Sequence, residues 1–504
     1  MVSRLILKPT AEDHRLVAFY AGKVITGVGF LMLIPMLVSL AFAEWDSLLN
    51  LAIGLLLCLT VGLTAQAAFY TRADLRRRHG FVVVSTSWIA ATVLGAAPYA
   101  LSGHYSRFTD CLFDVMSGFT TTGLYLLQDL DHVSNGLNMY RHLLSFVGGQ
   151  GIVVLALTFL FRGAGSTFQL YAGEGKDERL VPHVVGTARI IWIIGLVWLA
   201  LGTVALAGSL MWLGESPVRA LLHGVWIFMG AFSTGGFAPQ SYNTVWYHSL
   251  LFEVVTIIIM FAGSLNFALH WAAWTGKPRE LLRNIETRSF AATFTLFVAI
   301  ATYALARQGV YSDDITMFRK VFYQIMSGHT TTGFSTIYSR AFVTHWGPLA
   351  MLATVAAMAI GASACSTAGG IKGLRIGITT KTFLLSIKEM VSPDSAAVVA
   401  RYHHIRDTVL TDAAARSALT ITTAFLTMYG LITILGVMAG YPLAEAAFEG
   451  VSAASNTGLS CGVAAPGMPQ GLELAYVLAM WLGRMEFLAV FAFVGWMWAV
   501  VRGR

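Results

Sequence analysis

The sequence predicts an all-α polytopic membrane protein in which four similar units surround one pseudo-fourfold pore, preceded by a two-helix N-terminal hairpin. Three observations lead to this fold class. Of the 504 residues, 56% are hydrophobic and only 12% are charged, about half the charged share of a soluble protein. Apolar runs long enough to cross a bilayer recur along the chain. A short motif rich in glycine and threonine occurs four times, at intervals of roughly 110 residues.

The first two apolar runs, at 16–43 and 47–70, are expected to form the hairpin within a first domain at 1–79. The first run is too long for a signal peptide and is followed by a second span, so an uncleaved anchor is predicted. Arg76, Arg77 and Arg78 follow the second run. Because basic residues gather on the cytoplasmic side of membrane proteins, both ends of the hairpin are expected inside.

Each of the four units is expected to contain a first span, a half-length apolar segment, the motif and a second span. The predicted units are 80–165, 166–276, 277–400 and 401–504. Their expected elements are 81–101, 108–118 and 140–161; 188–213, 217–231 and 246–272; 289–306, 315–328 and a span from 344; and 413–439, 443–455 and 472–501. Arg and Lys gather at the junctions between units, which places both termini in the cytoplasm. The net charge of +7 then requires no nucleic acid.

The four glycine motifs read Ser-Gly-Phe-Thr-Thr-Thr-Gly-Leu at 117–124, Gly-Ala-Phe-Ser-Thr-Gly-Gly-Phe at 230–237, Ser-Gly-His-Thr-Thr-Thr-Gly-Phe at 327–334, and Ser-Ala-Ala-Ser-Asn-Thr-Gly-Leu at 452–459. A helix over the segment before each motif would be about 16–22 Å long, shorter than the hydrocarbon core of about 30 Å. Non-helical chain at that depth requires surrounding protein or a water-filled cavity. Four such segments predict a central axis, with helix C-termini that favour a cation.

The residues that end the motifs are the candidate ion-binding residues. They are Thr121, Thr122, Gly123, Thr234, Gly235, Gly236, Thr331, Thr332, Gly333, Asn456, Thr457 and Gly458. Glycine adopts backbone angles that a β-carbon resists, so carbonyl oxygens can turn toward the axis and replace the hydration shell of a monovalent ion. The absence of carboxylates here favours K+ over Ca2+ or Mg2+. In the alternative reading, the motifs are small-residue surfaces for helix packing.

The candidate gate lies in the third unit, where Gly361-Ala-Ser-Ala-Cys-Ser-Thr-Ala-Gly-Gly370 interrupts the second span. The gate residues named here are Gly361, Ser363, Ser366, Thr367, Gly369, Gly370 and, in the last span, Arg484. A charge at membrane depth is a functional candidate by default. The alternatives are a packing face of small residues and an Arg484 that is paired within the bundle.

Four polar residues near these stretches are expected to have lesser roles. Glu486 is not expected to pair with Arg484, because two residues apart on a helix point to different sides. Lys372 and Arg375 are expected to be interfacial anchors. His329, in the third motif, is expected to pack behind it, with a pH-sensing role as the alternative.

The motifs, together with 148–157, 366–375 and Gly-Arg-Met-Glu at 483–486, resemble the Trk/Ktr/HKT superfamily of potassium transporters, and the two extra N-terminal spans resemble its TrkH/TrkG type. The resemblance implies potassium uptake through a selectivity filter, with a gating loop at 361–370 and Arg484 opposing cations below the filter. It further implies a homodimer, a cytosolic TrkA-type nucleotide-binding regulatory subunit, and a bacterial cytoplasmic (inner) membrane location. In that family, glycine at all four filter positions goes with K+ selectivity.

K+ is expected as the transported ion, with no organic cofactor in this chain, membrane lipid around it and no nucleic acid. The sequence leaves open channel-like flow and Na+- or H+-coupled K+ symport. An intramembrane enzyme is the alternative from another class. It is disfavoured because no HExxH or GxSxG motif and no obvious pair of intramembrane carboxylates occurs. The four cysteines lack metal-binding spacing, and a disulfide between Cys111 and Cys461 is disfavoured.

Overall fold

The computed structural model describes residues 9–73, 75–151, 184–393, 395 and 398–502. Within these ranges, seven helices are long and apolar enough to cross a membrane, or nine if each of two bent pairs counts as one span. The predicted all-α polytopic membrane fold is confirmed. The end of the first unit's second span, at 152–161, and the boundary predicted after 165 lie outside the described residues.

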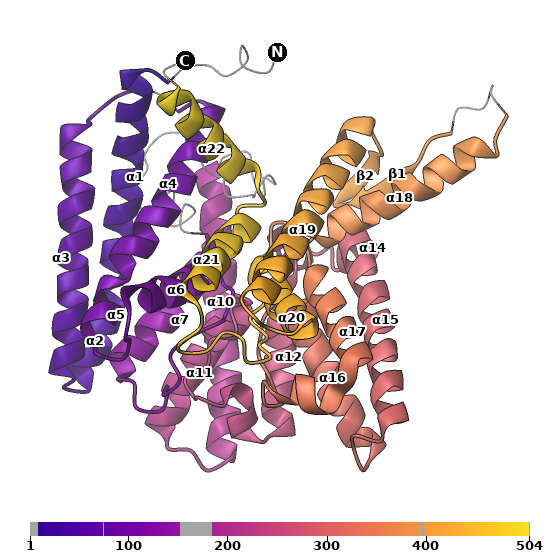
Figure 1. Cartoon of the computed structure of the whole chain (residues 1–504), viewed down its shortest axis with the longest axis horizontal. Coiled ribbons are helices and arrows are strands. Elements are labelled where there is room, and N and C mark those ends of the chain that lie inside the picture. Colours follow the sequence, from indigo (N-terminus) through magenta and orange to yellow (C-terminus); the bar gives the residue numbers. More distant parts are fainter. Residues whose placement is uncertain (1–8, 74, 152–183, 394, 396–397, 503–504) are drawn as a thin grey trace.

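The two predicted N-terminal spans pack against each other (Figure 1). They consist of α1 (Ala11–Leu31), which continues into α2 (Leu33–Ala41), and of α3 (Trp45–Ala68). α1 begins with a capping box, in which Thr10 and Asp13 each bond the backbone N–H of the other. α1 and α3 approach closely at small residues, since a Cβ on Gly62 would lie 2.3 Å from Thr26 Oγ1. This close approach fixes how the two spans pack.

Each predicted half-length segment is a helix: α6 (Phe108–Phe119), α11 (Pro217–Phe232), α16 (Asp314–His329) and α20 (Leu443–Ala454). The helices before them are α4 (Arg77–Gly95) with α5 (Ala97–Leu101), α10 (Val184–Trp212), α15 (Ile285–Gln308) and α19 (Asp412–Met438). The elements after them are α7 (Asn135–Gln150), η2 (Asn243–Tyr247) with α12 (Leu250–Ser264), η3 (Phe342–Trp346) with α17 (Gly347–Ala359), and α21 (Gln470–Arg484). These bounds differ from the sequence-based ones by a few residues.

Two spans that the sequence predicts to be continuous are broken. α12 is followed by α13 (Phe267–Trp274) at an angle of 102°, and α21 by α22 (Leu488–Val501) at 114°. At the first break Asn266 caps α13 through its side chain. At the second, Glu486 and Phe487 have φ of +49° and +67°, which an α-helix does not accommodate. Sequence periodicity did not reveal either break, because apolar residues continue on both sides.

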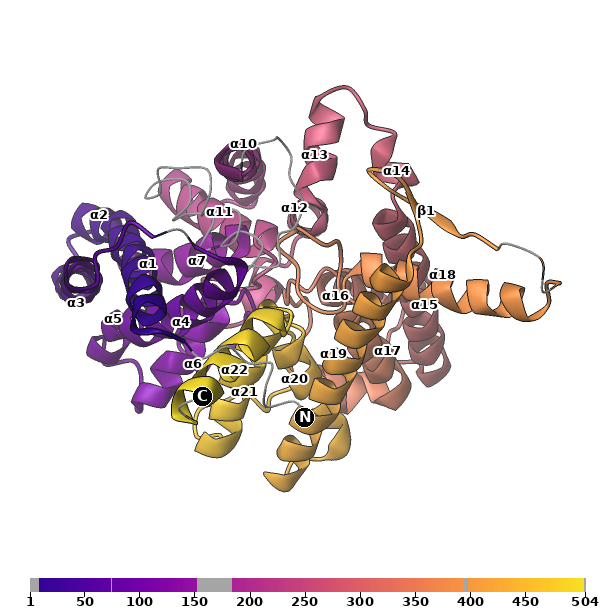
Figure 2. The same ribbon diagram turned by 90° about the horizontal axis from the view of Figure 1, so that it is seen from above.

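The four units follow one another around the molecule (Figure 2). Neighbouring units contact each other through the helix pairs α7 with α11, α12 with α16, α17 with α20, and α21 with α6, and the pairs α18 (Gly373–Met390) with α19 and α22 with α4 add further contacts between units. The last pair joins the fourth unit back to the first. The helices therefore form a closed arrangement whose centre is reached by the C-terminal ends of α6, α11, α16 and α20.

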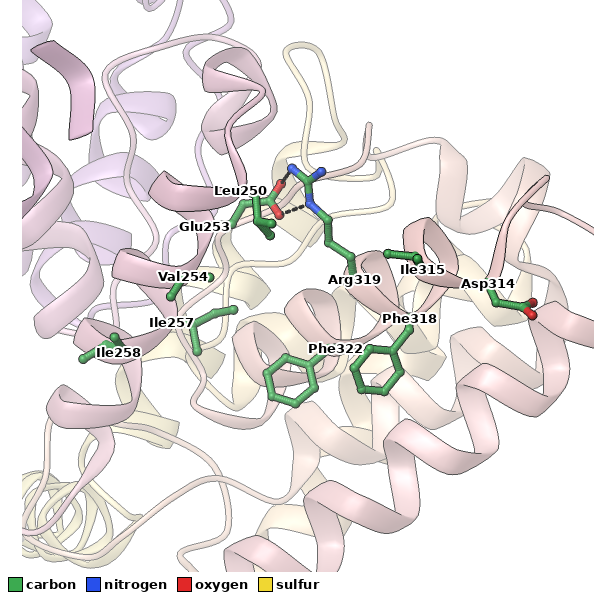
Figure 3. Close-up of a pocket in the computed structure, with 10 residues that line it drawn as sticks. All are labelled: Leu250, Glu253, Val254, Ile257, Ile258, Asp314, Ile315, Phe318, Arg319 and Phe322. Atoms are coloured by element: carbon green, nitrogen blue, oxygen red, sulfur yellow. Dashed lines mark hydrogen bonds and ion pairs between the residues drawn. The ribbon is translucent and has the colours of Figure 1, made fainter. Parts of the chain in front are cut away.

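The junction of α12 and α16 is fastened by an ion pair beside an apolar groove of about 610 Å³ (Figure 3). Arg319 Nε and Nη2 donate to the two carboxylate oxygens of Glu253 at 2.5 and 2.9 Å. Such a bidentate pair fixes orientation as well as distance. The second and third units are therefore held in a defined register.

A β hairpin that the sequence did not predict joins the third and fourth units. Its strands, β1 (Arg401–His404) and β2 (Arg406–Val409), are antiparallel, with Arg401 opposite Val409. It lies beside α18 (Gly373–Met390) and α14 (Glu280–Arg283). The start of α1, the end of α22 and this hairpin lie toward the same end of the molecule (Figure 1). All four cysteines are free thiols, so no disulfide joins Cys111 and Cys461.

Candidate ion-conduction site

The four glycine motifs share one backbone path. Two residues before each final glycine stands a residue with positive φ: Thr121 at +55°, Thr234 at +51°, Thr331 at +55° and Asn456 at +56°. The final glycines also have positive φ: +87° at Gly123, +63° at Gly236, +87° at Gly333 and +86° at Gly458. The intervening residue closes the turn, because its N–H donates to a carbonyl near the end of the preceding helix, as Thr122 donates to Ser117 at 2.8 Å. The structure thus gives the same conformation to four separate segments.

The final glycines pack against one another in a ring. A Cβ built on each would collide with the carbonyl oxygen of the residue before the next glycine. The distances are 2.5 Å from Gly123 to Gly235, 2.1 Å from Gly236 to Thr332, 2.2 Å from Gly333 to Thr457, and 2.0 Å from Gly458 to Thr122. The last contact returns to the first motif and closes the ring. A side chain at any of these positions would displace the backbone of the neighbouring motif.

Three motifs contain a hydroxyl pair that the second lacks. The pairs are Thr120 with Thr122 at 2.8 Å, Thr330 with Thr332 at 2.8 Å, and Ser455 with Thr457 at 2.7 Å. In the second motif Gly235 stands in place of the threonine. Ser145 of α7 fills that space: a Cβ on Gly235 would lie 1.9 Å from Ser145 Oγ, which is hydrogen-bonded to Ser233 Oγ at 2.8 Å. The departure in sequence is therefore compensated by a neighbouring helix.

In the first, third and fourth units, a polar side chain three residues before the motif supports the loop that follows the final glycine. Asp114 accepts the N–H of Leu126 at 2.7 Å. Glu449 accepts the N–H groups of Cys461 and Ala464 at 2.8 and 2.9 Å. In the third unit Gln324 lies against Ser335 and Thr336. Sequence reasoning missed these residues, although a polar residue at a constant offset in an apolar segment was a visible signal.

An intramembrane loop, residues 360–372 between α17 and α18, lies directly against three of the motifs. Thr234 Oγ1 donates to Thr367 Oγ1 at 3.1 Å, and the N–H of Gly369 donates to Thr331 Oγ1 at 2.7 Å. A Cβ on Gly369 would lie 2.1 Å from the carbonyl oxygen of Ser455. The candidate gate residues Thr367 and Gly369 therefore contact residues that precede the final glycines of the motifs.

The two ends of the intramembrane loop meet at glycines. A Cβ on Gly361 would lie 1.8 Å from the carbonyl oxygen of Gly369, and Gly370 has φ of +65°. Within the loop, Ser366 Oγ donates to the carbonyl oxygen of Ser363 at 2.6 Å. The loop is therefore a compact turn with a narrow neck, and only glycine fits at Gly361.

Arg484 joins this loop to the first unit. Its Nη1 donates to the carbonyl oxygen of Thr367 at 2.6 Å and lies 3.3 Å from Thr121 Oγ1, and its Nη2 donates to the carbonyl oxygen of Gly148 at 2.6 Å. Glu486 instead pairs with Arg375 and lies 4.0 Å from Lys372 Nζ. The expectation that Lys372 and Arg375 are interfacial anchors is wrong, because both side chains are largely buried beside a carboxylate.

His329 packs behind the third motif, as expected. Its imidazole ring stacks on Phe290 with centroids 4.4 Å apart, and Nε2 lies 2.8 Å from Thr293 Oγ1.

A cavity of about 400 Å³ reaches the ring of four glycines on the side that faces away from the intramembrane loop. Gly123, Gly333 and Gly458 line it, together with Ser335. The glycine ring therefore lies between an open cavity and a loop that touches it.

A family model described as "TrkH: Cation transport protein" matches residues 48–495. The chain is 29% identical over 486 residues to an uncharacterized cation transporter of Methanocaldococcus jannaschii, covering 96% of each chain. It is 28% identical over 507 residues to the Trk system potassium uptake protein TrkG of Escherichia coli K12, covering 96% of this chain and 98% of that protein.

The crystal structure of the potassium transporter TrkH from Vibrio parahaemolyticus has the same fold, with a TM-score of 0.79 at 22% identity. The match covers 95% of this chain and 98% of that one. Family members transport cations, so this chain is a transporter and not an enzyme. The family model spans most of the chain, including all four glycine motifs, the intramembrane loop and Arg484. The chain therefore belongs to the TrkH family of cation transport proteins.

Proposed function

We propose that this protein takes up potassium by passing K+ through the ring of four glycine motifs, which acts as a selectivity filter. The observation that carries the proposal is the closed ring, in which each final glycine lies against the carbonyl oxygen before the next. A rigid ring of backbone carbonyl groups is suited to replacing the hydration shell of a monovalent cation. The relatives named as potassium uptake proteins support K+ as the ion.

The filter is formed by the twelve candidate residues of the sequence analysis, from Thr121 to Gly458. The C-terminal ends of four half-length helices point toward them and contribute partial negative charge. Asp114 and Glu449 add buried carboxylates behind two of the outer loops. These charges favour a cation, while the fixed backbone of the motifs selects among cations.

The intramembrane loop and Arg484 form the gate. The loop contacts three motifs from one side, and Arg484 brings a positive charge to the same place. A cation leaving the filter on that side meets both. Conduction therefore requires that the loop and the guanidinium group move aside together, since Arg484 is bonded to Thr367.

The protein works as a homodimer in the bacterial inner membrane, with both termini in the cytoplasm. A TrkA-type nucleotide-binding subunit regulates it from the cytosol. The names of two relatives assign them to a Trk system. The start of α1, the end of α22 and the β hairpin lie toward the same end of the molecule (Figure 1), which supports a common cytoplasmic side.

The test is K+ and Na+ uptake in cells that lack their own K+ transporters. The wild type is expected to restore growth at low K+. Gly123→Ser is expected to lose the preference for K+, because its Cβ collides with the carbonyl oxygen of Gly235. Gly103→Ser is the control, since Gly103 also has positive φ (+76°) but nothing within 4 Å of a Cβ. An unchanged K+/Na+ ratio in Gly123→Ser would show that the motifs only pack helices.

A further inference from the structure

Glu286 is a buried carboxylate that belongs neither to the proposed filter nor to the gate residues named above. It holds the first half of the intramembrane loop. Glu286, in the first turn of α15, has a fully buried side chain. Its Oε1 accepts the N–H of Ala364 at 2.6 Å, and its Oε2 lies 3.4 Å from Asn266 Nδ2. Hydrogen bonds to a charged acceptor are roughly twice as strong as neutral ones. Glu286 is therefore a strong attachment point for a loop otherwise built from small residues.

The neighbouring loop residues attach to the same region. Ser363 N–H donates to the carbonyl oxygen of Ser264 at 3.2 Å, and the N–H of Phe267 donates to that of Cys365 at 3.3 Å. Both partners lie at the break between α12 and α13. At the exit of the loop, a Cβ on Gly373 would lie 3.3 Å from the carbonyl oxygen of Glu286. Glu286 thus bonds the first half of the loop through its carboxylate, and its backbone lies close to Gly373, where α18 begins.

The other side of Glu286 faces the β hairpin. His404 Nδ1 lies 3.9 Å from Glu286 Oε2 and 3.5 Å from the Oδ1 of Asn284, the residue that caps α15. The adjacent His403 bonds Glu280 of α14, with Nε2 2.6 Å from the carboxylate. Two consecutive histidines of the hairpin, His403 and His404, therefore contact the turn between α14 and α15.

We propose that Glu286 is the positioning residue through which the β hairpin controls the intramembrane loop. The inference rests on the gate of the proposed function. With the hairpin seated, His404 lies beside the carboxylate, the Oδ1 of Asn284 accepts the N–H of Glu286 at 2.9 Å, and the carboxylate accepts the N–H of Ala364. When the hairpin moves away, Glu286 loses its outer partner, and its hold on the loop weakens. A binding partner that displaces the hairpin thereby releases the intramembrane loop without contacting it.

The chain carries a native probe of this loop, Cys365, which directly follows Ala364 and is buried. The experiment follows modification of Cys365 in membrane vesicles by a small thiol reagent, with peptide mass spectrometry. Buried Cys58, in α3, is the internal reference. Glu286→Ala is expected to raise the Cys365 rate about tenfold, the effect of losing a buried hydrogen bond. Glu286→Gln, which keeps an acceptor, is expected to give a smaller increase.

His404→Ala is expected to raise the same rate, and the double variant His404→Ala/Glu286→Ala to react no faster than Glu286→Ala alone. Such non-additivity is the signature of two residues that act in series. Glu445→Gln is the matched control, because Glu445 pairs with Arg340 and no described contact joins it to the hairpin or to the loop. Its rate is expected to stay at the wild-type value.

Equal rates in Glu286→Ala and wild type, or additive effects of the two substitutions, would overturn the inference. An equal effect of Glu445→Gln would do the same, since it would mean that the Cys365 rate follows a general loosening of the protein. If Glu286→Ala does not insert, Glu286→Gln and His404→Ala carry the test. Potassium flux is measured on the same vesicles: failure of the proposed function removes wild-type flux, whereas failure of this inference leaves flux intact and the Cys365 rates unchanged.

Discussion

The Nη1 atom of Arg484 donates a hydrogen bond of 2.6 Å to the carbonyl oxygen of Thr367. One residue ends α21, before the break in the last span, and the other lies in the middle of the intramembrane loop. The break in the last span and the interruption in the third unit therefore meet at a charged contact beside the glycine motifs. Movement of either interruption alters this contact.

Replacing Arg484 by Gln is expected to increase K+ flux in the absence of a regulatory partner. The substitution removes a positive charge from the ion path and a charge-assisted bond to the loop, so a rise of about tenfold is expected. Flux is measured as rubidium uptake into proteoliposomes. Arg502→Gln, which removes a charge at the end of α22, is the control and should leave flux unchanged. A flux equal to that of the wild type would show that Arg484 is only a structural residue.

The second motif offers a test of the compensation by Ser145. Gly235→Thr alone is expected to abolish growth at low K+, because its Cβ would lie 1.9 Å from Ser145 Oγ. Combined with Ser145→Gly, it should restore growth, since the double variant recreates the threonine found in the other three motifs. Growth no better than that of Gly235→Thr would mean that the motif requires Gly235 itself. Ser145→Gly alone should reduce growth less than Gly235→Thr, because it removes a buried hydroxyl pair and adds a glycine to α7 but causes no collision.

The carboxylate of Glu449 braces the outer loop after Gly458. Glu449→Ala leaves two buried N–H groups without an acceptor, so we expect a loss of about 1–3 kcal/mol of stability for each. The ratio of K+ to Na+ uptake should fall as the loop relaxes. Glu445→Gln serves as the control, because Glu445 pairs with the exposed Arg340 and such pairs contribute about 0–1 kcal/mol. Thermal unfolding in detergent and ion uptake are the measurements. A selectivity equal to wild type in Glu449→Ala would contradict the bracing role.

The seating of the β hairpin is expected to depend on pH through His403. Hydrogen bonds to Glu280 and Asp407 raise the pKa of His403 above its ordinary 6.5. A raised pKa in the folded state stabilises the seated hairpin fully below pH 6.5, and this contribution is lost as pH rises through the higher folded value. Hydrogen exchange of the hairpin amides should therefore be slower at pH 6 than at pH 8, after correction for intrinsic rates. In His403→Gln the difference should vanish; a difference that persists would assign it to another group.

The sequence was sufficient to predict the elements whose signal is local. Apolar runs predicted the spans, and the repeated glycines predicted which segments share a conformation, because positive φ is most readily adopted by glycine. Contacts between distant segments were not predictable. Nothing near Gly235 indicates that Ser145 occupies its space. The pairing of Glu486 with Arg375 depends on a helix break that residue types do not mark. The role of Glu286 required knowing that α15 begins beside the loop.

The ring of glycines is formed by one chain, so its four positions are encoded separately. In a ring of four identical subunits, any substitution appears four times and changes every wall at once. Here a substitution changes the residue of one motif and directly affects the neighbouring motif that it contacts, while the other motifs keep their own residues. The second motif already differs from the others, with Gly235 and the hydroxyl of Ser145 in place of a threonine. Selection can therefore change the preference among cations one motif at a time. Residues near that motif can compensate for each change before the next one occurs.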